Sequence, residues 1–428
     1  MIAPARRMAF EVLSRIDRGG TFSDEALNSP ALLALDRRDR SLVAEIVYGT
    51  LRSLAELNHV LKGASSIAWD GVEPGIKTLL QMSLYQLWRL DRIPHHAVVN
   101  DAVGLAKRVG NSRGAAGFVN GVLRSLSRTR PWCNEDFDRR LPEWVAASLP
   151  EWLWYRWASR YGSQAAAEYA KSLCEKPTCA YWCRAPGERN DGECGDSIPS
   201  DVVPGAQVSQ SSTRGSGIWV QDEASQLIPH LFGPCAGWRV WDACACPGGK
   251  TALLISGTGR SGAVASSDRS KGRVRRMSQM LRDFYGERPS VLVADASVSP
   301  PFRVEFDAVL ADVPCSGLGT LRRNPEIKWK FKPEQLLSIQ SQQAAILASV
   351  AKAVRPKGLL LYSTCSTEPE ENELVVDAFL ARNPAFRLVR PAHPPGIDRW
   401  LDHRGLLRTF PDTRLWDGFF AALMIRNS

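Results

Sequence analysis

The sequence contains no long apolar run, few histidines and no secretory leader pattern. No uninterrupted apolar stretch reaches the roughly 18 residues that a membrane span requires, and the 428 residues include 6 histidines. The N-terminus is basic and then apolar, but Glu11, Arg15 and Asp17 interrupt any signal-peptide core. These absences argue against a membrane protein and a secreted one, and we expect a cytoplasmic protein.

The cysteines lack the spacing of a zinc site. Ten are scattered along the chain, and in a reducing compartment the informative ones are catalytic or metal-binding. Cys174, Cys179, Cys183 and Cys194 lie near one another in sequence, but their spacing is not CxxC-like and no histidine is near. Zinc usually takes closely spaced cysteine and histidine ligands, so we predict no metal site.

Charge and length set broad limits. The sequence has 54 basic and 45 acidic residues, for a formal net charge of +9. This excess favours an anionic partner such as nucleic acid, although many basic proteins bind none. A length of 428 residues leaves room for two or three domains.

The N-terminal part, residues 1–130, is predicted to be helical throughout. Leu80, Leu84 and Leu87 repeat at helical spacing, and Pro94 ends that segment. A later apolar helix face lies beside a basic group made of Lys107, Arg108, Arg113, Arg124 and Arg128. This group is either a solvated helix surface or a surface that faces RNA.

Residues 131–217 are predicted to form a connecting subdomain or linker. Its first part contains five tryptophans, which indicates packed helices. From Ala185 to Gly217 the composition changes to glycine, serine, proline and aspartate, which predicts loops or irregular structure.

From residue 218 to 428 the pattern alternates between apolar strands and amphipathic helices. This order predicts a mostly parallel sheet covered on both faces, the doubly wound α/β arrangement, with ligands at the carboxyl ends of the strands. The predicted strands are 239–244, 263–268, 290–295, 306–312 and 358–365. The predicted helices are 249–256, 270–284, 333–354 and 369–382. DGFFAALMIR adds a last strand, and residues 404–410 are candidates to pair near it.

A glycine-containing turn, WDACACPGGKT at 241–251, follows the first predicted strand. Gly248 and Gly249 permit either a close backbone approach to a ligand or a structural tight turn. The turn is not a P-loop, because that motif needs glycine where Cys244 stands. GTGRSG at 257–262 matches GxGxxG, but it follows a helix and precedes a strand, so we predict a helix C-cap and turn.

Aspartates end three successive predicted strands. Asp268 lies nineteen residues beyond Gly249, where a carboxylate accepts ribose hydroxyls in nucleotide-binding folds, and Asp295 and Asp312 end the next two strands. Each alone is consistent with a helix cap. Together they describe a nucleoside pocket without a pyrophosphate cradle, which suits S-adenosylmethionine better than NAD.

Two cysteines follow the ends of buried strands. Cys315 comes after Asp312-Val313-Pro314, and Cys365 comes after a second apolar run. Both thiols should therefore face the nucleoside crevice. A thiolate that adds to carbon 6 of cytosine makes carbon 5 nucleophilic, and this is covalent catalysis. The side chain of Asp312 could then bond the ring near N3, and a second thiol could assist release.

Five motifs carry a family resemblance: QDEAS, DACACPGGKT, DVPCSGLGTLRRNPEIKW, STCSTEPEENE and DGFF. They resemble the Nol1/Nop2/Sun family of RNA cytosine-C5 methyltransferases. The resemblance implies Cys365 as nucleophile, Cys315 as releasing thiol and S-adenosylmethionine as methyl donor. It also implies that the donor is contacted by, or lies beside, Cys244, Ala245, Cys246, Pro247, Gly248, Gly249, Lys250, Asp268, Asp295 and Asp312.

The N-terminal half has a resemblance of its own. ARRMAFEVLSRIDRGGTFSD, DRSLVAEIVYGTLR and GFVNGVLR are similar to the helical NusB-type RNA-binding domain. The combination resembles the Sun/Fmu branch of the family, which implies the 16S rRNA site equivalent to cytosine 967 as target. The resemblance further implies action on rRNA before or during small-subunit assembly, with no membrane and no obligate protein partner.

Two positions depart from the family pattern. Cys246 stands where the family usually has alanine, and we expect it to pack without a chemical role. PDTRLWDGFF lacks the histidine often found just before DGFF.

On the loop after Cys315, the basic residues Arg322, Arg323, Lys328 and Lys330 are predicted to hold RNA phosphates, or else form a solvated loop. Trp329 would stack on a base or belong to the core.

Other functions remain open at this point. Asp312-Val313-Pro314-Cys315 faintly resembles the [DN]PP[YF] motif of amino-methyltransferases, but a thiol stands in place of the aromatic residue. A cytosine methyltransferase acting on another RNA, such as tRNA, is a further alternative. So is a non-catalytic RNA-binding or antitermination factor, against which Asp312, Cys315 and Cys365 argue.

Overall fold

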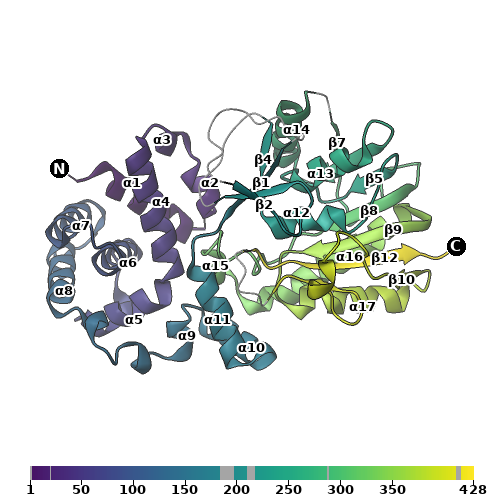
Figure 1. Cartoon of the computed structure of the whole chain (residues 1–428). Coiled ribbons are helices and arrows are strands. Elements are labelled where there is room, and N and C mark those ends of the chain that lie inside the picture. Colours follow the sequence, from purple (N-terminus) through teal and green to yellow (C-terminus); the bar gives the residue numbers. More distant parts are fainter. Residues whose placement is uncertain (1, 20, 184–196, 210–216, 287–288, 411–415) are drawn as a thin grey trace. The chain divides into compact units, whose positions relative to one another are not determined.

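The computed structural model describes residues 2–19, 21–183, 197–209, 217–286, 289–410 and 416–428 (Figure 1). The chain divides into two compact units. Unit 1 comprises residues 1–176 and 321–330, and unit 2 comprises residues 177–320 and 331–428. Within the described ranges, no helix has both the length and the apolar character needed to cross a membrane.

Unit 1 is helical, as its sequence predicts. Leu80, Leu84 and Leu87 are buried in one hydrophobic core, and their helix ends at Arg89, five residues before Pro94. The first eight helices are α1 Pro4–Asp17, α2 Ser23–Leu27, α3 Pro30–Leu33, α4 Arg37–Arg52, α5 Leu54–Ala64, α6 Pro74–Arg89, α7 His95–Val109 and α8 Ala115–Thr129. They are followed by α9 Glu143–Ala146, α10 Glu151–Tyr161 and α11 Ser163–Cys174, and α15 Ile327–Lys330 comes from the inserted segment. Single 3₁₀ turns lie at Trp69–Gly71, Pro131–Cys133 and Asp138–Arg140.

The main sheet of unit 2 has the order β10-β12-β9-β8-β5-β6-β7, with β11 paired to β12. Five neighbouring strands are parallel, and β10 to β12 add antiparallel pairs at one edge. The strands are β5 Arg239–Asp242, β6 Ala263–Asp268, β7 Ser290–Val293, β8 Phe306–Asp312, β9 Val354–Thr364, β10 Phe386–Leu388, β11 Leu407–Arg408 and β12 Phe420–Arg426. The predicted mostly parallel sheet is confirmed, as are the last strand and its partner near residues 404–410.

Helices cover both faces of this sheet (Figure 1). Apolar side chains of β5, β8 and β9 pack with those of α12 and α13 in one core cluster. The helices are α12 Glu223–His230, α13 Gly249–Thr258, α14 Lys271–Tyr285, α16 Leu336–Val350 and α17 Glu373–Arg382. Single 3₁₀ turns lie at Pro333–Gln335, Ala351–Ala353, Pro369–Glu371 and Ile397–Trp400. GTGRSG forms the predicted helix end, because α13 stops at Thr258 and Gly259 is its C-cap with a φ of 63°.

The strand order reverses between β5 and β8. The chain runs outward from β5 through β6 to β7 and then returns to β8 on the other side of β5. The loops that follow two such strands diverge, so a crevice opens at their carboxyl ends. The turn after Asp242 and the loop after Asp312 therefore border the same crevice.

A smaller antiparallel sheet precedes the main one, with the order β2-β3-β1-β4. Its strands are β1 Cys179–Cys183, β2 Ser197–Pro199, β3 Ala206–Ser209 and β4 Ile218–Val220. The prediction of irregular structure for 185–217 is wrong for β2 and β3, whose sequences of three and four residues are too short to stand out as strands. Residues 184–196 and 210–216, with Cys194 of the rejected zinc group, lie outside the described residues. Within the described ranges, no three metal-binding side chains gather.

The predicted connecting region, 131–217, falls into both units. Its helices α9, α10 and α11 belong to unit 1, and its strands β1, β2 and β3 belong to unit 2.

Candidate active site

A crevice lies at the carboxyl ends of β5 to β8. It brings together three of the predicted cofactor residues, Cys244, Asp268 and Asp295, with apolar walls from Pro314 and Ile346. Its other lining residues are Ala243, Arg269, Arg273, Ala294, Ala296 and Gln342. Carboxylates beside apolar walls fit the ribose hydroxyls and the flat base of a nucleoside, so this donor set suits the adenosine part of S-adenosylmethionine.

The two carboxylates of the crevice already have partners. Asp268 is buried, and it accepts from the backbone nitrogen of Ser270 at 2.8 Å and from the guanidinium of Arg273. Asp295 is exposed and accepts from the nitrogen and hydroxyl of Ser297 at 2.9 and 2.6 Å, which lowers its pKa. Asp295 therefore also has the bonding of a local turn.

The two glycines of the 241–251 turn are explained by packing. Gly248 has a φ of +113°, and a Cβ there would lie 2.9 Å from the side chain of Met277. A Cβ on Gly249 would lie 2.8 Å from the amide oxygen of Gln221. A larger residue at either position would displace a neighbour, so the tight-turn explanation is sufficient.

The cysteines of this turn are held as thiols. Burial, with the nearby Asp268, raises the pKa of Cys246 to about 12, and its sulfur lies 3.9 Å from that of Met277. Burial also raises the pKa of Cys244 well above its ordinary value. Protonated thiols are poor nucleophiles, which agrees with the expectation that Cys246 only packs.

Asp242, at the end of β5, should make stability depend on pH. Burial raises its pKa from 3.8 to about 7, although Thr251 donates to it at 2.6 Å. The unfolded chain loses this proton near pH 4 and the folded chain near pH 7. The protonated Asp242 side chain therefore adds to the free energy of unfolding. This contribution is complete below about pH 4, declines between about pH 4 and 7, and is absent above about pH 7.

Asp242→Asn should flatten that pH dependence, because asparagine does not ionise. The test is the urea midpoint at pH 5 and pH 8, with Asp283→Asn, at an exposed position of α14, as control. The Asp242 variant should show a smaller difference between the two midpoints than the parent protein, and the control should not. An unchanged difference would mean that Asp242 is ionised at pH 5 in the folded protein.

Lys250 and Asp312 form a partly buried ion pair. The lysine Nζ donates to Asp312 Oδ2 at 2.8 Å, and the hydroxyl of Ser363 donates to Oδ1 at 2.7 Å. Burial opposes the positive charge of Lys250, but Asp312 and then Cys365 raise its pKa above the ordinary value. Lys250 therefore stays charged, with its ammonium 4.8 Å from the centre of the Phe419 ring.

The two predicted thiols lie together at the ends of β8 and β9. The Sγ atoms of Cys315 and Cys365 are 3.1 Å apart, and the backbone nitrogen of Cys365 donates to Cys315 Sγ at 3.3 Å. The hydrogen bond with Cys365, then burial, raises the pKa of Cys315 well above its ordinary value. The pair therefore consists of one thiol held in its protonated form and a second sulfur that it can donate to.

Backbone contacts hold the loop that follows Cys315. Gly319 donates to Cys365 O at 2.9 Å, and Gly418 donates to Gly319 O at 2.7 Å. A Cβ on Gly319 would lie 1.9 Å from Gly418 O and 2.9 Å from Cys365 O. Three motifs distant in sequence thus meet at one glycine, and nothing larger fits.

The predicted RNA role of the basic loop at 321–330 is wrong for Arg322 and Lys328. Both are buried within unit 1: Arg322 donates to Ser172 Oγ at 3.0 Å, and Lys328 donates to Ser148 O at 2.5 Å. Burial lowers the pKa of Lys328 to about 8. Their charges are taken up inside the helical unit and are not available to phosphates.

The rest of that segment also bonds within unit 1. Glu326 is buried and accepts from the backbone nitrogen and hydroxyl of Ser23 at 2.8 and 2.9 Å. Trp329 donates to Leu51 O at 2.7 Å, and Lys330 donates to Thr21 O at 3.1 Å. Trp329 is partly buried, and its two predicted roles, stacking on a base or packing in the core, stay predictions.

The parallel sheet, its reversal at β5 and the nucleoside crevice define a Rossmann-like, S-adenosylmethionine-dependent methyltransferase. Residues 230–425 match the model of the 16S rRNA methyltransferase RsmB/F family, and residues 3–128 match that of the NusB family. The chain is 32% identical to the probable ribosomal RNA small subunit methyltransferase B of Bacillus subtilis, over 98% of both chains. It therefore belongs to the RsmB/F family of rRNA methyltransferases, with a NusB-type N-terminal domain.

Other relatives agree with this assignment. The ribosomal RNA small subunit methyltransferase B of Thermus thermophilus is 32% identical, over 98% of this chain and 97% of that one. The crystal structure of PH0851 aligns over 99% of both chains with a TM-score of 0.78 at 23% identity, which supports the fold. The predictions of the family, the fold class, a methyltransferase activity and S-adenosylmethionine as methyl donor are confirmed.

Sequence reasoning missed Glu371 and Ser316, and it gave Lys250 no role beyond the cofactor. Glu371 lies in a run of acidic residues that has the composition of a solvated helix start. A possible signal was the repeated Cys-Ser pair at 315–316 and 365–366.

Proposed function

We propose that this protein methylates carbon 5 of a cytosine in 16S rRNA, at the site equivalent to cytosine 967, through a covalent bond between Cys365 and carbon 6. The observation that carries the proposal is the pair of sulfurs 3.1 Å apart at the ends of β8 and β9. Relatives that align with nearly the whole chain bear the name of small-subunit rRNA methyltransferases. We further propose that the substrate is rRNA before or during assembly of the subunit.

In the first step, the thiolate of Cys365 adds to carbon 6, and the ring becomes nucleophilic at carbon 5. The partly buried ammonium of Lys250 is the group to which we assign the activation of this thiol, because it places a positive charge near Cys365 and is itself held by Asp312. Asp312 then acts through Lys250, whose charge also stabilises negative charge developing on the ring. S-adenosylmethionine supplies an electrophilic methyl group when bound.

In the second step, the carbon 5 proton is transferred to Cys315. The electrons of that C–H bond form the double bond between carbons 5 and 6, and those of the C–S bond return to Cys365. For this step Cys315, which is partly exposed, must first release its own thiol proton to solvent water. Sulfurs only 3.1 Å apart allow Cys315 to reach carbon 5 while Cys365 is bonded to its neighbour.

The deciding experiment is incubation with methyl-labelled S-adenosylmethionine and unmodified rRNA, followed by mapping of the modified nucleotide. Label on carbon 5 of one 16S cytosine supports the proposal. Label on adenine would rule out the mechanism, and label only on tRNA would change the substrate. RNA binding without label would favour a non-catalytic factor.

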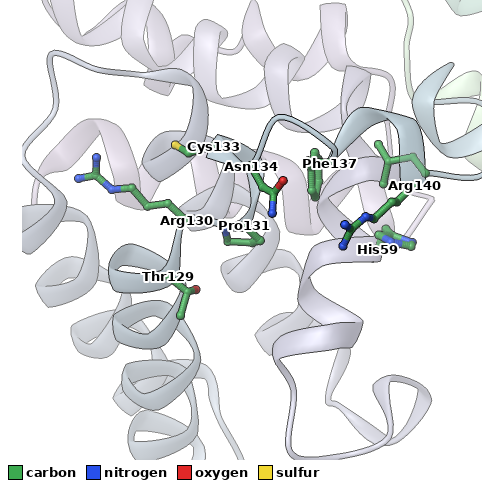
Figure 2. A pocket seen from close by; sticks show the side chains of 9 residues that line it. His59, Thr129, Arg130, Pro131, Cys133, Asn134, Phe137 and Arg140 are labelled. Atoms are coloured by element: carbon green, nitrogen blue, oxygen red, sulfur yellow. The ribbon is translucent and has the colours of Figure 1, made fainter.

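We propose that the helical unit holds the RNA on the surface of α7 and α8. A hollow of about 380 Å³ there is lined by His95, His96, Val99, Asn100, Arg124, Ser127 and Arg128, without a carboxylate. Arg124 and Arg128 are exposed and lie one turn apart on α8. A second hollow of about 510 Å³ adjoins the end of α8, with His59 and Arg130 in its lining (Figure 2).

Replacing both Arg124 and Arg128 with glutamate should weaken RNA binding. The change removes two phosphate contacts, so the slope of log affinity against log salt should become shallower by about 2. KM for long rRNA should rise while kcat stays near the parent value. The control is Arg37→Glu with Arg38→Glu, the same charge change at two exposed residues of α4. Equal slopes for the two variants would place the RNA elsewhere.

A further inference from the structure

One buried carboxylate connects the two loops that carry the thiols. Each cysteine of the pair is followed directly by a serine, Ser316 after Cys315 and Ser366 after Cys365. Both serine hydroxyls donate to Glu371, and they lie 3.1 Å from each other. The side chain next to each reactive sulfur is therefore tied to the same group.

The bonds of Glu371 use both of its oxygens. Oε1 accepts from the backbone nitrogen of Ser316 at 2.7 Å and from Gln343 Nε2 at 3.2 Å. Oε2 accepts from Ser316 Oγ at 2.5 Å and from Ser366 Oγ. Gln343 also donates to Pro314 O at 3.0 Å, on the other side of Cys315. The loop at Cys315 is thus fixed at the residues before and after the cysteine.

The backbone of Glu371 is fixed as well. Tyr362, in β9, donates its hydroxyl to Glu371 O at 2.5 Å, and the next residue, Asn372, donates to Ser366 O at 2.9 Å. Glu371 is fully buried. It is therefore anchored to the strand that leads into Cys365, and it cannot reach a bound base.

Glu371 also acts on Cys315 through its charge. It is one of the groups that raise the pKa of Cys315, after the hydrogen bond to Cys365, burial and the charge of Cys365. Burial raises the pKa of Glu371, and the four hydrogen bonds donated to its carboxylate offset only part of that increase. A carboxylate at this position favours the protonated form of Cys315 while leaving Cys365 next to Lys250.

We propose that Glu371 is the positioning residue that holds the sulfurs of Cys315 and Cys365 at reacting distance, by binding the serine that follows each. The geometric part of this proposal concerns the protein without RNA. Its consequence for the release of the methylated RNA from Cys365 rests on the function proposed above. The carboxylate fixes the relative position of two loops that come from different strands. Without this carboxylate, each cysteine would still follow its own strand, but the distance between the two sulfurs would no longer be fixed.

The first experiment tests directly whether the two sulfurs are held close together, and it needs no RNA. Diamide, an azo oxidant, converts a thiol pair to a disulfide: two thiols lose two protons and two electrons, and the N=N bond is reduced to a hydrazine. Peptide mapping follows formation of the 315–365 disulfide in the full-length protein, with Cys315→Ala as blank. Glu371→Ala should slow this disulfide about tenfold to a hundredfold, the cost of about 1 Å of misplacement.

Two further variants separate geometry from charge. Glu371→Gln keeps the shape and should oxidise at least as fast as the parent, because its oxygen still accepts from Ser316 N and the charge that favours the protonated form of Cys315 is gone. Ser316→Ala with Ser366→Ala removes only the hydroxyl donors and should be slow, so the test stands even if Glu371→Ala does not fold. Glu223→Gln is the matched control, a buried glutamate that accepts from Ser200 and Trp416 away from the thiols.

The second experiment uses single-turnover methylation of rRNA. Glu371→Ala should accumulate the covalent RNA adduct, since release needs both sulfurs in place, whereas Glu223→Gln should not. Parent-like disulfide formation in Glu371→Ala, or in the double serine variant, would overturn the positioning role. The variants could form the disulfide slowly while the parent enzyme does not methylate cytosine. That result would uphold the positioning role of Glu371 and rule out the proposed function.

Discussion

Replacing Cys365 with alanine is expected to abolish methyl transfer, whereas replacing Cys315 is expected to trap the RNA on the protein. Without Cys365 no sulfur adds to carbon 6, so carbon 5 stays unreactive and no adduct forms. Without Cys315 the methyl group is still transferred, but the carbon 5 proton is not removed and the C–S bond persists. The loss in the first case should be about 10⁴-fold or more, as for other deleted nucleophiles.

The measurement is a denaturing gel of protein incubated with rRNA and labelled methyl donor. Cys315→Ala should give a slow band that carries both RNA and label, and Cys365→Ala should give neither. Cys235→Ala, a buried cysteine outside the crevice, is the control and should behave like the parent. An adduct in the Cys365 variant and none in the Cys315 variant would exchange the two roles.

Gly319→Ala should be nearly as damaging, for a purely steric reason. The added Cβ would lie 1.9 Å from Gly418 O, and neither backbone can yield without breaking a bond between them. We expect a loss of about 3 to 5 kcal/mol in the free energy of unfolding, in the range of severe overpacking and lost hydrogen bonds. Methylation should fall below detection, because Gly319 also bonds Cys365 O.

Gly272→Ala is the matched control for this change. Gly272 lies in α14 of the same unit, and a Cβ there meets nothing within 4 Å. Alanine in that helix should leave activity unchanged and raise stability by about 0.5 to 1 kcal/mol. Urea unfolding and single-turnover rates of both variants test the claim, and equal behaviour would show that the loop at Gly319 is not tightly held.

Local sequence pattern was enough for the sheet and for the residues at its edge. A buried parallel strand is apolar nearly throughout, so its end is visible, and the crevice edge follows from the strand order. This is why Asp268, Asp295, Cys315 and Cys365 could be placed before any coordinates. Sequence could not supply the partners of these groups, since the bonds of Lys250 and Glu371 join segments about sixty residues apart and fifty-five residues apart.

In the charged loop after Cys315, the local sequence pattern led to a wrong prediction. Arg322 and Lys328 look like solvent-exposed cations, because a charged side chain is seldom buried without a partner. Their partners are carbonyl and hydroxyl oxygens at the ends of helices in unit 1, and such acceptors leave no mark in the sequence. Glu326 likewise finds Ser23, more than three hundred residues earlier in the chain.

The segment 321–330 also decides how this protein can be divided. It belongs to unit 1, although it is inserted between β8 and α16 of unit 2, so the polypeptide passes from one unit to the other three times. A fragment that stops at residue 176 would lack it and would leave Ser23, Leu51 O and Ser148 O without these donors and acceptors. Expression of the helical part on its own should succeed only when a peptide spanning these ten residues is supplied or fused to it.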